Sequence, residues 1–136
     1  MMETIRQKAE RMLDRTETLV LATVDEKGFP RPVPMVKLYS DGFGEIWFST
    51  DTEAEKVSHL RMNPRAGICL YERGNMVALT GTAEVIDDPE TKRQMWQEWM
   101  IAHFRGGESD PTYCLIRFRA TGATYWIDRR AGRETL

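Results

Sequence analysis

The residues best placed to hold a negatively charged ligand lie where an apolar strand ends, at Ser49 and Thr50, and in the turn that follows. Thr52 stands where a helix would begin, and Lys56 lies one turn further on. Free backbone amides and the helix dipole both favour an anion at a helix N-terminus, so the pattern is typical of a phosphate site. The ordinary alternative is that Thr52 caps the helix, with Glu55 completing a capping box, and that Lys56 is solvated.

A second candidate is the proline-broken segment Arg31–Lys37. Prolines cannot donate to a strand ladder, so we expect them on an edge strand or at a bulge. Neighbouring backbone groups would then be free to bind a flat polar ring. The alternative is an edge strand with no ligand.

Aromatic side chains form the third group. They suit the walls of a flavin pocket, although such residues most often fill a core or an interface. The chain offers Trp47, Trp96, Trp99, Tyr125 and Trp126.

Hydrolytic, dinucleotide-binding and metal chemistry find no support in the sequence. It contains no glycine-rich dinucleotide fingerprint, phosphate loop, HExxH pair or nucleophile elbow. His59 and His103 lie far apart without an acidic partner at an obvious spacing, and Cys69 and Cys114 are isolated. We therefore expect no metal site and two buried free thiols.

Length and charge narrow the class of protein. The chain has 136 residues, 41% of them hydrophobic, which suits a single domain spanning 1–136. A net charge of −2 argues against a nucleic-acid partner, which requires a basic surface. The charged start of the chain lacks the apolar stretch of a signal peptide, and Leu19–Val24 is too short to cross a bilayer. We expect a cytoplasmic protein that binds no membrane.

Hydrophobic periodicity predicts the elements that must position these residues. Helices are expected at about Glu3–Asp14 within residues 1–15, at Thr52–Met62, and from Asp88 onward, where Met95, Trp96, Trp99 and Met100 form an apolar stripe. Strands are expected at Leu19–Val24, Arg31–Tyr39, Glu45–Ser49, Ala66–Tyr71, Met76–Ile86, Tyr113–Arg119 and Thr121–Asp128. Residues 129–136 would be a polar tail. Six to seven antiparallel strands with peripheral helices indicate a mainly β protein of the α+β class, folded as a closed or partly closed barrel.

Taken together and in this order, these segments resemble the pyridoxamine 5'-phosphate oxidase-like proteins. The resemblance runs from about Leu19 to Asp128. It is carried by Leu21–Asp25, Gly28–Met35, Trp47–Thr50, Lys56–Val57 and Leu60–Arg65. Three further segments are most similar to the bacterial general stress protein branch: Val77–Ala83, Gly107–Pro111 and Tyr125–Trp126.

The resemblance implies an FMN-binding split β-barrel that forms a homodimer, with flavin sites at the subunit interface. It places the proline-broken segment along the isoalloxazine ring, with these residues: Arg31, Pro32, Val33, Pro34, Met35 and Lys37. Ser49 and Thr50 would meet the ribityl chain and phosphate. Thr52 and Lys56 would bind the phosphate, and Trp126 would approach the flavin of the partner subunit.

Two departures from the family pattern restrict the activity. The oxidases carry a C-terminal Arg- and His-containing motif that grips the substrate, whereas Arg129–Leu136 contains no histidine. The phosphate helix offers only Lys56 where the oxidases have an Arg-Lys pair. We therefore expect an FMN-dependent oxidoreductase that acts on an unidentified small molecule other than pyridoxamine phosphate. The alternatives are a non-catalytic flavin-binding stress protein, or a split barrel that holds a deazaflavin or haem.

Overall fold

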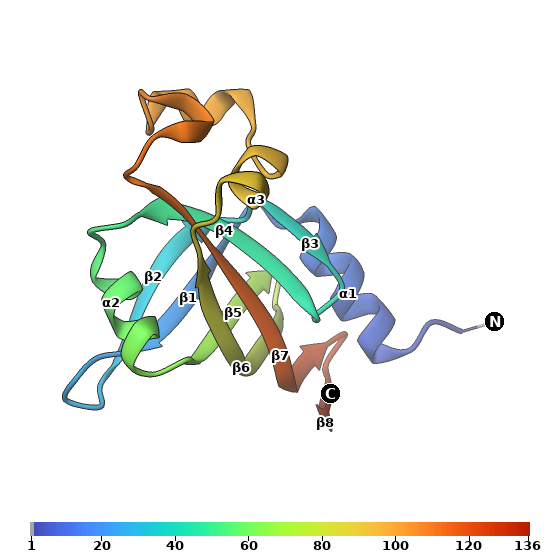
Figure 1. Cartoon of the computed structure of the whole chain (residues 1–136). Helices are drawn as coiled ribbons and strands as arrows, with labels where there is room; N and C mark the ends of the chain where they lie inside the picture. Colours follow the sequence, from blue (N-terminus) through green and yellow to red (C-terminus); the bar gives the residue numbers. More distant parts are fainter. Residues whose placement is uncertain (1) are drawn as a thin grey trace.

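The computed structural model describes residues 2–136, which form one antiparallel sheet wrapped into a half-barrel with helices at its sides and end (Figure 1). The strands are β1 Thr18–Val24, β2 Pro30–Val36, β3 Tyr39–Asp41, β4 Glu45–Asp51, β5 Arg65–Glu72, β6 Asn75–Ile86, β7 Tyr113–Ile127 and β8 Arg130–Thr135. The helices are α1 Ile5–Arg15, α2 Glu55–Met62 and α3 Pro89–Gln94, with 3-10 turns η1 Glu98–Ala102 and η2 Gly107–Ser109. The α+β split barrel is therefore confirmed.

Strand order in the sheet is β2-β1-β5-β6-β7-β4-β3, and β8 pairs with β7. The side helices α1 and α2 lie on opposite sides of the barrel, and α3 with the two 3-10 turns caps one end (Figure 1). Alternate strand residues such as Leu21, Ile68, Leu79 and Phe118 point inward and are buried in the main core. Among the helices of residues 2–136, none has the length and apolar character needed to span a bilayer.

The prolines of β2 lie on a free edge of the sheet. Strands β1 and β2 pair without interruption from Thr18↔Val36 to Val24↔Pro30. The next residue, Lys37, donates its backbone N–H to Glu17 O (2.8 Å). Donors therefore point toward β1 at the odd positions of β2, and the missing donors of Pro30, Pro32 and Pro34 all fall on the outer edge. The expectation that these prolines lie on an edge strand is confirmed.

A single bulged strand, β7, replaces the two strands expected between Tyr113 and Asp128. Thr80 pairs with Gly122 and Gly81 pairs with Ala120, so Thr121 has no partner in β6. On its other edge β7 pairs first with β4 and then, beyond the bulge, with β8. A bulge bends a strand, and here it lets β7 pair with β4 before the bulge and with β8 after it. The sequence therefore predicted two strands that meet at the bulge.

The C-terminal segment is not a tail. Residues Arg130–Thr135 form β8, paired with β7 from Gly122 to Ile127. The connecting turn places Asp128 (φ 53°) and Arg129 (φ 63°) in the left-handed region, as a two-residue hairpin turn requires. A polar sequence without glycine at the turn gave no signal of this hairpin.

The start of α2 also differs from expectation. Strand β4 continues to Asp51, and the Thr52 N–H donates to Thr112 O (2.8 Å). The helix begins at Glu55 with Ala54 as its N-cap, and no side chain caps it. The predicted capping box of Thr52 and Glu55 is therefore wrong, because the β-sheet holds Thr52 before the helix can form.

The helix expected from Asp88 through Met100 is broken. Asp88 caps α3 by accepting from Thr91 N (2.9 Å), as predicted, but α3 ends at Gln94. The chain then turns into η1, whose Met100 is fully buried against the second core beside Tyr113. Tertiary packing at the barrel end overrides helix propensity there.

Candidate functional site

A pocket of about 380 Å³ opens between the free edge of β2 and the end of β4. We call it the β2–β4 pocket. Its lining residues are Pro34, Met35, Val36, Ser49, Thr50, Asp51, Trp99, His103 and Phe104. They come from three segments: the C-terminal half of β2, the C-terminal end of β4, and the part of the cap formed by η1 and the two residues after it.

The pocket exists because β2 and β4 do not pair with each other, although such pairing would have closed the barrel. Strand β3 pairs only with Glu45–Trp47, so the rest of β4 has no strand on that side. The β2–β3 connection is fixed by Leu38, whose N–H donates to Trp47 O (2.8 Å). Beyond that point β2 and β4 diverge, and the split between them forms the pocket.

Next to the pocket, the first turn of α2 offers unsatisfied donors. Its N-cap Ala54 supplies no side-chain acceptor, and Asp51 is occupied in accepting from Glu53 N (2.7 Å). Lys56 is half-buried, and no carboxylate of residues 2–136 lies within 4.0 Å of its ammonium. An uncapped helix start beside a lysine with no ion pair favours an anionic ligand.

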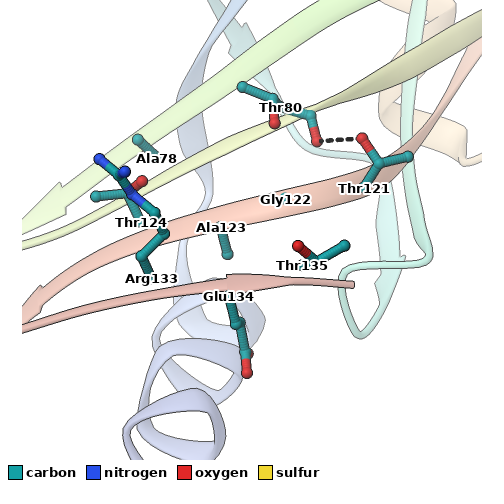
Figure 2. A pocket seen from close by; sticks show the side chains of 9 residues that line it. All are labelled: Ala78, Thr80, Thr121, Gly122, Ala123, Thr124, Arg133, Glu134 and Thr135. Carbon is teal, nitrogen blue, oxygen red and sulfur yellow. Dashed lines mark hydrogen bonds between the residues drawn. The ribbon is translucent and has the colours of Figure 1, made fainter.

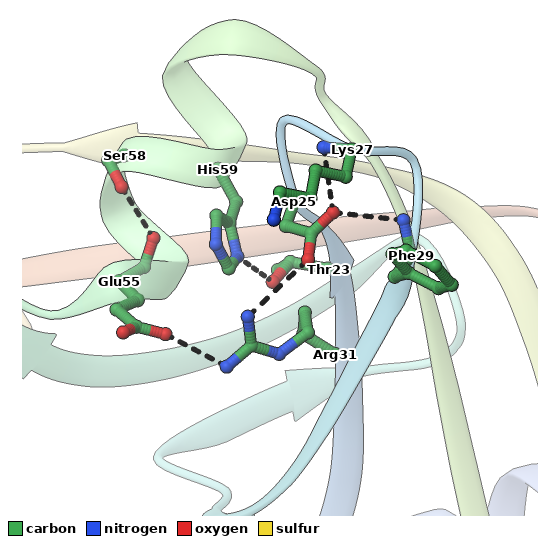
Figure 3. A network of polar contacts seen from close by, with 8 residues as sticks. All are labelled: Thr23, Asp25, Lys27, Phe29, Arg31, Glu55, Ser58 and His59. Carbon is green, nitrogen blue, oxygen red and sulfur yellow. Dashed lines mark hydrogen bonds and ion pairs between the residues drawn. The ribbon is translucent and has the colours of Figure 1, made fainter.

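Arg31 is held by two carboxylates rather than by the pocket (Figure 3). Its guanidinium lies 3.4 Å from Asp25 Oδ2 and 3.0 Å from Glu55 Oε2, so it ties the β1–β2 turn to the first turn of α2. His59, from the same helix, is buried and shares a 2.9 Å hydrogen bond with Thr23 Oγ1. These contacts set the position of α2 against the barrel.

Asp25 organises this turn through its charge. Its Oδ1 accepts from Phe29 N and Lys27 N, both at 2.9 Å, and Arg31 lies beside Oδ2. The backbone N–H of Phe29, followed by the backbone N–H of Lys27 and the guanidinium of Arg31, lowers the pKa of Asp25 below its usual value. Stabilisation by this carboxylate is therefore present above the unfolded-state pKa and disappears as pH falls through the folded-state pKa.

Replacement of Asp25 by asparagine is expected to destabilise the protein near neutral pH and to matter less in acid. Protonated aspartic acid resembles asparagine, so the two proteins should converge in stability from roughly pH 5 down to roughly pH 3. Urea unfolding at several pH values measures the difference. Glu26→Gln, in the same exposed turn but without a side-chain hydrogen bond in the described chain, is the control. A difference between Asp25→Asn and wild type that is constant with pH would contradict the assignment.

The structure brings only some of the predicted site residues together. Pro34, Met35, Ser49 and Thr50 line the β2–β4 pocket. Pro32, Val33, Arg31, Thr52 and Lys56 lie on adjoining parts of β2, the β4–α2 connection and α2, outside the lining.

Two predicted residues are directed elsewhere in their own chain. Lys37 donates to the last carbonyls of α1, Leu13 O (2.5 Å) and Asp14 O (3.3 Å), and burial lowers its pKa. Trp126 is 45% exposed on the outer face of β7 and does not line the pocket of its own chain. That exposure leaves Trp126 free to meet another molecule.

Sequence reasoning missed several lining residues: Asp51, Trp99, His103 and Phe104. One signal was available, because Trp99 and His103 are four positions apart and would share a face of any helical turn. We instead expected Trp99 in core or dimer packing and gave His103 no role.

A larger hollow of about 660 Å³ lies on the outer face of β6, β7 and β8 (Figure 2). Threonine hydroxyls dominate its lining, and Thr121 Oγ1 donates to Thr80 O at 3.4 Å. Arg133 is the cation at its edge (Figure 2). None of the predicted site residues lines it. The β2–β4 pocket is therefore the better candidate for chemistry.

Comparison with known proteins agrees with this architecture. The family model described as "Pyridoxamine 5'-phosphate oxidase like" matches residues 4–134, nearly the whole chain. No curated protein is similar enough in sequence to match.

Solved structures share the fold along the whole chain. A Clostridium acetobutylicum protein related to general stress protein 26 of B. subtilis is 22% identical, with a TM-score of 0.88 over 100% of this chain and 97% of that chain. The general stress FMN/FAD binding protein of Xanthomonas citri is 25% identical, with a TM-score of 0.75 over 97% of this chain and 96% of that chain. A heme binding protein of Mycobacterium smegmatis is 18% identical, with a TM-score of 0.78 over 99% of this chain and 59% of that chain.

Proposed function

The chain belongs to the pyridoxamine 5'-phosphate oxidase-like family, and from that premise we propose that it binds FMN in the β2–β4 pocket. One observation carries the proposal: a pocket between two free strand edges adjoins an uncapped helix start and Lys56, which makes no ion pair with any residue of 2–136. The first part suits a flat ring with polar edges, and the second suits a phosphate. A solved relative in fold is itself described as an FMN/FAD binding protein, which supports the choice of flavin.

The residues present fit FMN in chemical type. The outer edge of β2 offers backbone groups at Pro34 and Val36 that no neighbouring strand uses. Ser49 lies between the ring site and α2 and would hydrogen-bond the ribityl chain. The free amides of α2 and the Lys56 ammonium would receive the phosphate, which carries close to two negative charges at neutral pH.

We propose further that the protein is an oxidoreductase. Bound FMN would supply hydride or electron transfer, while the chain binds the ring, orients it and restricts water. The second candidate is a binding protein without turnover. A third keeps the fold but holds haem, since His103 on the pocket wall could offer an imidazole ligand and one structural relative is described as heme binding.

Titration of the purified protein with FMN, and separately with haemin, tests these alternatives. We expect saturable FMN binding at one molecule per chain, with quenched flavin fluorescence and little affinity for haemin. Haemin binding that excludes FMN would overturn the flavin proposal. Reduction of the bound flavin by NADPH, followed by reoxidation with a small-molecule acceptor, would distinguish an enzyme from a binding protein.

The outer face of the sheet supports a homodimer. Cross-strand neighbours form three rows of small or apolar residues, and exposed side chains such as Tyr71 (73%) gather on this face. The rows are Ala22–Gly67–Thr80–Gly122, Val20–Cys69–Ala78–Thr124 and Tyr71–Met76–Trp126. These rows carry no charge from β1 to β7, and Arg133 of β8 lies at the edge of the middle row. Such a face matches the core of a protein interface, and a second copy of the chain fits it by two-fold symmetry. Trp126 would then face the partner's flavin.

The two cysteines provide a test of this dimer. We expected both to be buried, but only Cys114 is; Cys69 is exposed in the middle row. Burial raises the pKa of Cys114 to about 11, so it should resist iodoacetamide at about pH 8 in any assembly state. Cys69 should be protected at micromolar concentration and become reactive on dilution. Ala78→Glu, which places a charge beside Cys69, should give a monomer by sedimentation with rapid labelling of Cys69. Equal labelling of Cys69 at all concentrations would argue against this interface.

A further inference from the structure

The third wall of the β2–β4 pocket is aromatic and comes from the cap of the barrel. Trp99, His103 and Phe104 all line the pocket. Trp99 and His103 contact each other edge to face, with centroids 6.0 Å apart at 84°, and His103 meets Phe104 at 6.5 Å and 61°. The three rings form one continuous surface facing the strand edges.

The cap holds this wall in place before any ligand arrives. The Trp99 indole N–H donates to Gln97 Oε1 (2.7 Å), and Gln97 Nε2 donates to Leu38 O (3.1 Å) in the β2–β3 connection. Phe104 is buried and packs on Tyr113 with centroids 5.1 Å apart. The wall is therefore anchored to both the sheet and the second core, and little side-chain freedom remains to be lost on binding.

The wall also leaves apolar surface exposed at the pocket. The Trp99 side chain is 43% exposed, although its indole N–H already donates to Gln97. The surface that it exposes is therefore mainly the apolar face of the ring. Ile101 is similarly exposed (49%) on the same 3-10 turn but does not line the pocket. It therefore provides a matched reference for the exposed apolar surface of η1.

The charge of the lining restricts the ligand further. Asp51 is the one acidic residue in the lining, and no lysine or arginine lines the pocket. An anionic group inside would be desolvated next to a carboxylate without a cation. The cation Lys56 lies outside, where the proposed FMN phosphate would use it.

We infer that Trp99 and His103 are specificity-determining residues: Trp99 stacks on a flat, uncharged aromatic substrate, His103, nearly perpendicular to it, meets the edge of that substrate, and the lining disfavours phosphorylated substrates. The inference rests on the proposed function, because the same pocket would hold the flavin ring against β2 and leave the Trp99 wall to face its exposed side. His103 can give one hydrogen bond to a hydroxyl or carbonyl of the substrate.

Three probes of related skeleton test the inference: 2-naphthol, its phosphate ester, and decahydro-2-naphthol, which keeps the carbon skeleton without the flat aromatic ring. Calorimetric titration of the apo and the FMN-loaded protein gives each dissociation constant. The Trp99 indole N–H signal, assigned with Trp99→Phe, reports contact by NMR. We expect 2-naphthol to bind at least about ten-fold more tightly than either relative. Trp99→Ala should weaken it roughly ten-fold, whereas Ile101→Ala should not change it.

Other outcomes separate this inference from the proposed function. If FMN does not bind but 2-naphthol shows the expected preferences with the apo protein, the flavin proposal fails and the aromatic wall stands. If FMN binds but 2-naphthol binds no better than the decahydro compound or the phosphate, the inference is overturned alone. Failure of 2-naphthol to bind either form, or equal affinity in Trp99→Ala and wild type, also overturns it.

Discussion

Replacement of Gly81 by alanine is expected to lower the free energy of unfolding by at least about 3 kcal/mol. A Cβ at this position would overlap Arg119 O and lie 2.9 Å from Ala120 Cα. Both are backbone atoms of the bulge in β7, so no side chain can rotate away to relieve the clash. The strand would have to shift where it passes from β4 to β8, and hydrogen bonds on both sides would weaken.

Urea or thermal unfolding of Gly81→Ala measures this effect. Gly44→Ala is the control, because a Cβ there meets nothing within 4 Å. Its stability should lie between that of wild type and a gain of about 1 kcal/mol, since alanine restricts the unfolded chain. A Gly81→Ala protein as stable as Gly44→Ala would show that the bulge can be rebuilt at little cost.

Removal of the Lys56 ammonium is expected to weaken FMN binding by roughly ten- to a hundred-fold, the equivalent of about 1.5–3 kcal/mol for one charge-assisted hydrogen bond. The hydroxyl groups nearby and the amides of α2 can share the phosphate charge but cannot neutralise it. Arg31 cannot readily replace the lysine, because Asp25 and Glu55 already hold it. The fold should be unaffected, since Lys56 makes no ion pair within the described chain.

Titration of FMN and riboflavin into wild type and Lys56→Ala isolates the phosphate. Riboflavin lacks that group and should bind both proteins with similar affinity. Lys27→Ala, in the exposed β1–β2 turn, removes the same charge elsewhere and should leave FMN binding unchanged. Should Lys56→Ala bind FMN as tightly as wild type, the phosphate is held by another cation, with Arg31 or Arg65 the residues to replace next.

Much of the barrel was predictable because its elements carry local signals. Strand β1 is a mostly apolar run that ends before the Asp25–Gly28 turn, and α2 ends before Pro64 as expected. The prolines of β2 indicated an edge strand without any knowledge of its neighbours. In each case the residues that fix the element lie within it or beside it in sequence.

The parts that were missed depend on distant contacts. Strand β8 reads as a polar tail until β7 lies beside it, and its turn uses two non-glycine residues at positive φ. The Thr52 capping box fails because the Thr52 N–H pairs with Thr112, sixty positions later in the sequence. The aromatic wall of the pocket follows from the path of η1, which is set by burial of Met100 and by the Gln97 bond to Leu38.

The proline edge of β2 has a consequence for how the protein behaves in a crowded solution. An open half-barrel exposes strand edges, and an exposed edge is a template on which another chain can add and start aggregation. At Pro30, Pro32 and Pro34 the outer edge has carbonyl acceptors but no N–H donors. An incoming strand could donate hydrogen bonds to these carbonyls but would receive none from the three prolines. The barrel can thus keep its pocket open at this edge without inviting unwanted strand addition.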